Sequence, residues 1–94
     1  MTEAVFSCKD GRLALVCNKH SEFAIVCSGV SALVSALASY AYDTLGAQVA
    51  LEPGKAEIVC YDGIDSRLAF EVIWRGLKQI EMAYPRHLRV VGEV

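Results

Sequence analysis

The stretch that decides the fold is FAIVCSGVSALVSALASYAY, residues 23–42, which carries no charged side chain. From residue 28 to about residue 45, apolar side chains recur at the spacing of one helix face, as listed here: Val30, Leu33, Val34, Leu37 and Ala41. Gly46 follows, where glycine commonly ends a helix. The stretch is long enough to span a bilayer, but its serines and its strand-like first residues favour a buried helix.

Predicted hairpins lie on both sides of this helix. The first joins EAVFSCK (3–9) to RLALVCN (12–18) through Asp10-Gly11, a strong hairpin signal. The second joins AQVALE (47–52) to AEIVCYD (56–62) through PGK (53–55).

A second helix is predicted to begin at Asp65 or Ser66 and to stop before Pro85. The residues HLRVV (87–91) then form a short final strand. The inner stripe of this helix is predicted to comprise Ala69, Val72, Ile73, Gly76, Leu77 and Ile80.

The resulting order, ββαββα plus a short C-terminal strand, predicts one domain over residues 1–94. The expected fold class is α+β, a two-layer sandwich of a mainly antiparallel sheet with two helices on one face. Small residues on both helices, among them Gly29 and Gly76, predict that the helices lie directly against each other.

Composition excludes several classes of partner. The chain is 54% hydrophobic, and its 9 basic residues against 11 acidic ones give a net charge of −2, so we expect neither nucleic acid nor a membrane as partner. We expect no targeting signal, because the first residues carry an acid at position 3 and no basic region before an apolar run. The four cysteines are widely spaced, which is typical of thiols in the reducing cytoplasm.

Two side chains suggest chemistry. Cys27 lies where the first helix is expected to begin, and a helix N-terminus stabilises the thiolate that acts as a nucleophile. His20, shortly before it, can take the thiol proton and return it to a leaving amine. The backbone N–H groups of Ser28 and Gly29 are candidate oxyanion donors.

Other interpretations of these residues stay open. Cysteine and histidine are both common in cores, where a thiol packs as a small hydrophobe. Cys17 and His20 also have a metal-ligand spacing, with Cys27 nearby, but a structural zinc site needs a fourth ligand, here Cys8 or Cys60 from another strand. We therefore predict no metal.

The run IVCSGVSALVSAL (25–37) resembles the signature of the ribosomal-processing cysteine proteases, the Prp family. The segment GLKQIEMAYPRHLRV (76–90) is similar to the end of that family's sequences, and the similarity extends along the chain. The resemblance implies that Cys27 is the nucleophile, that His20 is the general base, that Ser31 supports the site and that Gly29 lets substrate backbone approach. It also implies a cytoplasmic homodimer without cofactors. Such proteases trim a short N-terminal extension from a large-subunit ribosomal protein, after a pair of aromatic residues.

The chain departs from the family pattern around the histidine. Lys19 and Ser21 replace a glycine and an alanine, and Ala24 replaces an aspartate. The loop from His20 to Cys27 is also shortened. An alternative function is therefore a catalytically inactive, dimeric protein-binding module of the same fold.

The second helix suggests where a dimer would form. With the inner stripe facing the core, Phe70 and Trp74 remain one turn apart on its flank. We expect this patch either to meet itself across a two-fold axis or to be covered by a loop or the C-terminal strand.

Overall fold

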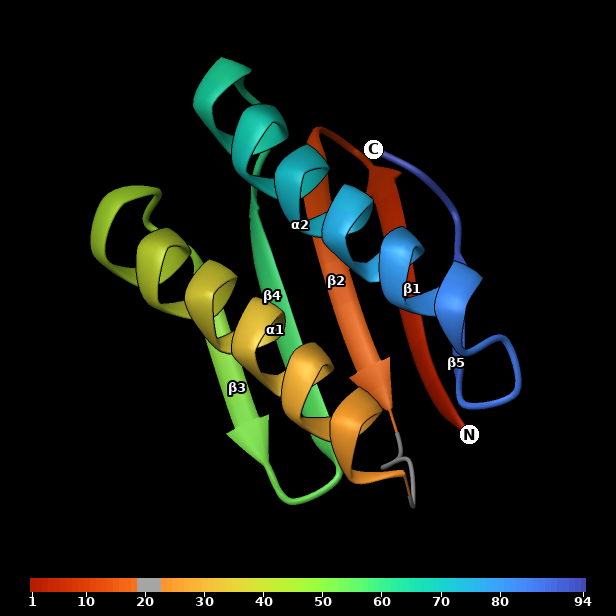
Figure 1. The fold of residues 1–94 in the computed structure, drawn as a ribbon. Helices are drawn as coiled ribbons and strands as arrows, with labels where there is room; N and C mark the ends of the chain where they lie inside the picture. The colour runs from red at the N-terminus through yellow and green to blue at the C-terminus, as the bar shows by residue number, and fades with distance from the viewer. Residues whose placement is uncertain (19–22) are drawn as a thin grey trace.

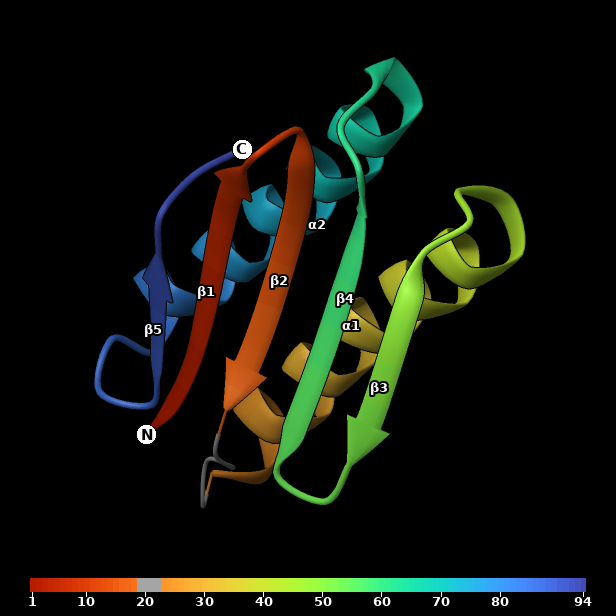
Figure 2. The same cartoon turned by 180° about the vertical axis from the view of Figure 1, so that it is seen from behind.

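The computed structural model describes residues 1–18 and 23–94. Its sheet has the strand order β3-β4-β2-β1-β5, in which β1 and β5 are parallel and every other pair is antiparallel. Both helices lie on one face of this sheet, and the other face is open (Figures 1 and 2). The predicted α+β two-layer architecture is confirmed. The elements are β1 (Thr2–Lys9), β2 (Arg12–Asn18), α1 (Ala24–Thr44), β3 (Gln48–Glu52), β4 (Lys55–Tyr61), α2 (Ile64–Ala83) and β5 (Leu88–Val91).

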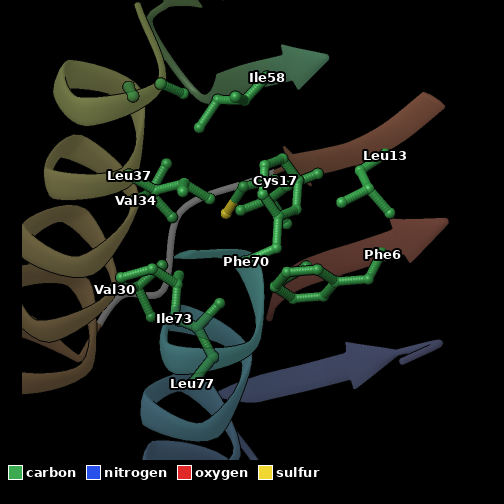
Figure 3. Close-up of a cluster of buried hydrophobic side chains, with 14 of the residues drawn as sticks. Phe6, Leu13, Cys17, Val30, Val34, Leu37, Ile58, Phe70, Ile73 and Leu77 are labelled. Atoms are coloured by element: carbon green, nitrogen blue, oxygen red, sulfur yellow. The ribbon is translucent and has the colours of Figure 1, made fainter. Parts of the chain in front are cut away.

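The core fills the space between the sheet and the helices (Figure 3). Strand side chains alternate between the two faces, so every second residue of the central strands points at the helices. In β2, for example, Leu13, Leu15 and Cys17 are buried, whereas their neighbours are partly exposed. Burial of this one face holds the layers together, since the apolar area removed from water is the main favourable contribution to folding.

Helix α1 buries the predicted stripe, of which only Leu33 is partly exposed. It ends at Thr44 with Leu45 as its C-cap, and the expected Gly46 follows with a φ of 62°, in the left-handed region that favours glycine. Its start differs from the prediction: the helix begins at Ala24, about one turn before residue 28. In the described part of the chain, α1 is the helix long and apolar enough to cross a membrane, with a mean hydropathy of 1.7. Packing in the core buries part of its apolar surface, whereas Ile25, Tyr40 and Tyr42 are exposed.

Helix α2 turns most of the predicted stripe inward: Ile73 and Leu77 are buried, and Ala69, Gly76 and Ile80 are partly buried. The prediction is wrong at Val72, whose place in the core is taken by Phe70. The N-cap of the helix is Gly63, and the helix buries Phe70, which is 1% exposed, whereas Val72 is 66% exposed. The sheet accepts the aromatic ring edge-on to Phe6, with ring centroids 6.4 Å apart. Phe70 and Trp74 therefore do not form a surface patch: Phe70 lies in the core, and Trp74 is covered by the C-terminal segment, the second of the two expected outcomes. Trp74 is half-buried, and its indole N–H donates a 3.0 Å hydrogen bond to the carbonyl oxygen of Gly92 in the C-terminal segment.

The two helices pack closely, as the small residues predicted. A Cβ atom added at Gly76 would lie 2.9 Å from Cδ1 of Leu33, and one added at Gly29 would lie 3.1 Å from Cδ1 of Ile80. Glycine at these two positions thus has a packing reason. For Gly29 this is a reason separate from any contact with substrate.

Candidate active site

Cys27 is a half-buried residue of the first turn of α1. Its backbone N–H donates a 3.0 Å hydrogen bond to the carbonyl oxygen of Phe23, the N-cap residue. The Phe23 ring packs 5.3 Å from the ring of Tyr84 and 4.9 Å from that of His87, between centroids. Aromatic contacts with the chain that follows α2 therefore hold the start of this helix in place.

The early start of α1 changes which backbone donors the helix end offers. Because Cys27 N–H already bonds within the helix, those of Ser28 and Gly29 also belong to the helical ladder. Their predicted use as backbone oxyanion donors does not fit this position. The backbone N–H groups that have no acceptor within the helix are those of Ala24, Ile25 and Val26, in its first turn.

A pocket of about 210 Å³ opens beside Cys27. Cys27 and Ser31 stand one turn apart on its helical wall, so the structure brings these two predicted residues together. Its other walls are distant in sequence: the start of β1, the end of β2, and the β3–β4 hairpin. The lining comprises Thr2, Cys17, Cys27, Val30, Ser31, Val34, Ser35, Leu51, Glu52, Gly54, Lys55 and Ala56.

A larger depression of about 360 Å³ lies between the outer sides of α1 and α2. Its walls are mostly apolar, and its one ionisable group apart from a tyrosine is Asp65. It contains no cysteine, serine or threonine. The smaller pocket is therefore the better candidate for chemistry.

Cys17 lines the same pocket as Cys27, which agrees with the closeness that sequence analysis considered only for a metal site. Burial raises the pKa of the Cys17 thiol, and the neighbouring Cys27 raises it further. Cys17 therefore stays protonated at neutral pH, a form that is a poor nucleophile. The alternation of β2 predicted its burial, but only the tertiary fold brings the end of β2 beside the first turn of α1.

The other two thiols lie away from the pocket. Cys60 is buried, and its burial raises its pKa. Cys8 is exposed near the far end of β1, where its sulfur lies 3.7 Å from Oδ2 of Asp62 and 3.7 Å from Nη2 of Arg67. Neither residue contributes to the Cys27 site.

His20, with Lys19 and Ser21, lies outside the described residues. The pairing of His20 with Cys27 therefore remains a prediction. Within residues 1–18 and 23–94, no group of three or more histidine, cysteine or acidic side chains is arranged to hold a metal. A metal site that includes His20 falls outside that search.

No family model and no curated protein matches this chain. Solved structures do match it along nearly its whole length. The essential ribosomal processing protease Prp from S. aureus, in complex with a covalently linked product peptide, superposes with a TM-score of 0.85 at 18% identity, over 97% of this chain and 98% of that one. The same protease in complex with a substrate peptide gives 0.83 at 17% identity, over 96% and 97%.

A third structure, SMU.848 from Streptococcus mutans, gives a TM-score of 0.76 at 20% identity, over 97% of this chain and 96% of that one. These likenesses confirm, at the level of the fold, the similarity to the Prp proteases that the sequence motifs suggested. The fold of this chain is that of a ribosomal-processing protease.

Proposed function

We propose that this protein is a cysteine endopeptidase with Cys27 as its nucleophile. The observation that carries the proposal is the position of Cys27: it is half-buried in the first turn of α1 and faces a pocket that also holds Ser31. The fold around this pocket matches that of a protease whose structure includes a covalently linked product peptide.

In the proposed reaction, the Cys27 thiolate attacks the carbonyl carbon of the scissile peptide bond. His20 first accepts the thiol proton and then gives it to the leaving amine as the carbon–nitrogen bond breaks. Water next hydrolyses the thioester and regenerates the thiol. The N–H groups at the start of α1, together with the Ser31 hydroxyl one turn after Cys27, are candidate donors to the developing oxyanion.

The proposed substrate is the short N-terminal extension of a large-subunit ribosomal protein, cut after paired aromatic residues. The reaction requires no cofactor, and the proposed location is the cytoplasm. The fold likeness to the ribosomal processing protease supports this choice of substrate class.

The test is incubation with peptides that carry paired aromatic residues, read by mass spectrometry. We expect cleavage by the wild type and none by Cys27→Ala. Cys60→Ala is the matched control, because the Cys60 thiol is also shielded from solvent but lies outside the pocket. If Cys27→Ala cleaves as fast as the wild type, Cys27 is not the nucleophile.

One observation favours the second candidate, an inactive protein-binding module. The first turn of α1 contains no acidic residue, and Ala24, its first residue, is exposed where the Prp pattern has an aspartate. A carboxylate there would be a candidate to orient the histidine. Peptide binding without cleavage would identify the chain as such a module.

We also propose a homodimer. Its interface is the exposed side of α2, and not the side of α2 that carries Phe70 and Trp74. Leu68 and Val72, 60% and 66% exposed, lie one turn apart on the outer side of α2. Asp65 precedes Leu68 by three residues, and Arg75 follows Val72 by three. If two α2 helices cross antiparallel about a two-fold axis, Leu68 of one copy meets Val72 of the other. The same axis brings each Asp65 opposite an Arg75.

A further inference from the structure

The two edges of the sheet differ in how their backbone groups are satisfied. At the β5 edge, the N–H of Val90 donates a 2.6 Å hydrogen bond to Oε2 of Glu81, and the indole of Trp74 bonds the carbonyl oxygen of Gly92 just beyond the strand. Side chains of α2 therefore close this edge.

The β3 edge is open. Within residues 1–18 and 23–94, no side chain hydrogen-bonds the backbone of β3. Glu52 pairs with Lys55 across a two-residue turn, and such closing pairs bond to each other. By alternation, the backbone groups of Leu51 and Val49 point away from β4, toward solvent. An edge strand with unpaired groups of this kind is a template for another extended chain.

A groove runs from the Cys27 pocket along this open edge. A second depression lies between α1 and β3, and it shares Ser35 and Leu51 with the pocket. Figure 1 shows the two elements that form it, with α1 over the side of the sheet that ends in β3. The second depression is lined by Ser35, Ala38, Ser39, Tyr42, Asp43, Val49 and Leu51.

We propose that this groove binds the substrate peptide as an extended strand beside β3, on one side of the scissile bond. The proposal rests on the proposed function, since it extends the Cys27 site. Main-chain hydrogen bonds to Leu51 and Val49 supply affinity, while alternate peptide side chains enter the groove against the hydroxyls of Ser35 and Ser39. An extended peptide fits because the edge offers main-chain groups, and the groove is continuous with the pocket that holds Cys27.

The dimensions of the groove set the length of peptide that it recognises. Cys27 and Tyr42 are fifteen positions apart on α1, which corresponds to about 22 Å at 1.5 Å per residue. An extended chain covers that distance with about six or seven residues. Affinity should therefore rise with peptide length up to about this number on one side of the cleavage site, and then level off.

The test uses the Cys27→Ala variant, so that binding is measured without cleavage. Peptides are extended one residue at a time on either side of a paired-aromatic centre, and dissociation constants and amide hydrogen exchange are recorded. We expect the longest peptide to protect the amides of Val49 and Leu51, and to leave the amides of β5 unchanged.

A blocking variant has a matched control on the same helix. Ser35 and Ala32 are both exposed, but Ala32 lines neither depression. Ser35→Trp should weaken binding of the long peptide by about tenfold or more, to the level of the short one, whereas Ala32→Trp should leave it unchanged. Equal affinities for peptides of all lengths, or unchanged amide hydrogen exchange at Val49 and Leu51, would overturn the proposal that the groove binds the peptide.

The outcomes also separate this inference from the proposed function. If the wild type cleaves peptides but affinity does not change with peptide length, the proposed binding along β3 is wrong and the proposed protease activity stands. If the long peptide protects the β3 edge but the wild type cleaves nothing, the groove stands and the protease does not.

Discussion

Truncation of Phe70 to alanine should remove a large part of the stability of the fold. The ring is 1% exposed and meets Phe6 edge-on. Loss of a buried phenylalanine typically costs about 3–5 kcal/mol, because burial is lost and a cavity remains. A chain of 94 residues has a total free energy of unfolding of only about 5–14 kcal/mol, at 0.05–0.15 kcal/mol per residue.

Val72→Ala is the matched control, since it removes apolar atoms from the opposite side of the same helix. Val72 is 66% exposed, so its truncation should change the free energy of unfolding by no more than about 0.5 kcal/mol. Urea unfolding followed by circular dichroism measures both values. In thermal melts, a loss of about 3 kcal/mol lowers the Tm by roughly 12–24 °C in a domain of this size.

The two variants test whether Phe70 or Val72 of α2 faces the core. If Val72→Ala destabilises as much as Phe70→Ala, the helix presents Val72 to the core, as the sequence pattern predicted. The exposed Leu68–Val72 surface and the dimer built on it would then be wrong as well.

Three further predictions concern charge. Burial raises the pKa of Glu81, but hydrogen bonds from Lys78 and from the Val90 N–H outweigh burial and leave that pKa below its usual range. Glu81→Gln should therefore lower the free energy of unfolding by about 1–3 kcal/mol at neutral pH, and by less as the pH falls through the lowered pKa. Urea titrations at several pH values measure this difference. Because the pKa of Cys17 is raised in the fold, stability should decline as the pH rises above 9.0, and Cys17→Ala should make that decline shallower in the same assay. Asp65→Arg or Arg75→Asp alone should weaken the dimer about tenfold or more in light scattering, and the double variant should restore it; a dimer insensitive to both single changes lies on another surface.

Local signals in the sequence were sufficient for the elements and their order. The turn at Asp10-Gly11 needs two residues at positive φ, observed at 53° and 73°, and such a dipeptide favours that conformation without help from the rest of the fold. The buried stripe of α1 was readable for a similar reason: Val30, Val34, Leu37 and Ala41 recur three or four residues apart, a spacing that local helix geometry places on one face.

In α2 one position of the inner stripe was predicted wrongly, because apolar residues lie next to each other there. Phe70, Val72 and Ile73 are all apolar, and periodicity alone does not choose among them. The tertiary structure chooses, since the sheet leaves room for an aromatic ring next to Phe6, and the C-terminal segment offers Trp74 a carbonyl group.

The same division holds for the candidate site. The sequence by itself determined that a cysteine lies in the first turn of a helix, with Ser31 one turn later, because both depend on local helix geometry. Only the tertiary structure decided that the β3–β4 hairpin faces them and that Cys17 from β2 shares their pocket. The physical reason is that a pocket forms where elements distant in sequence pack, and the surface that they leave open depends on how all of them fit together.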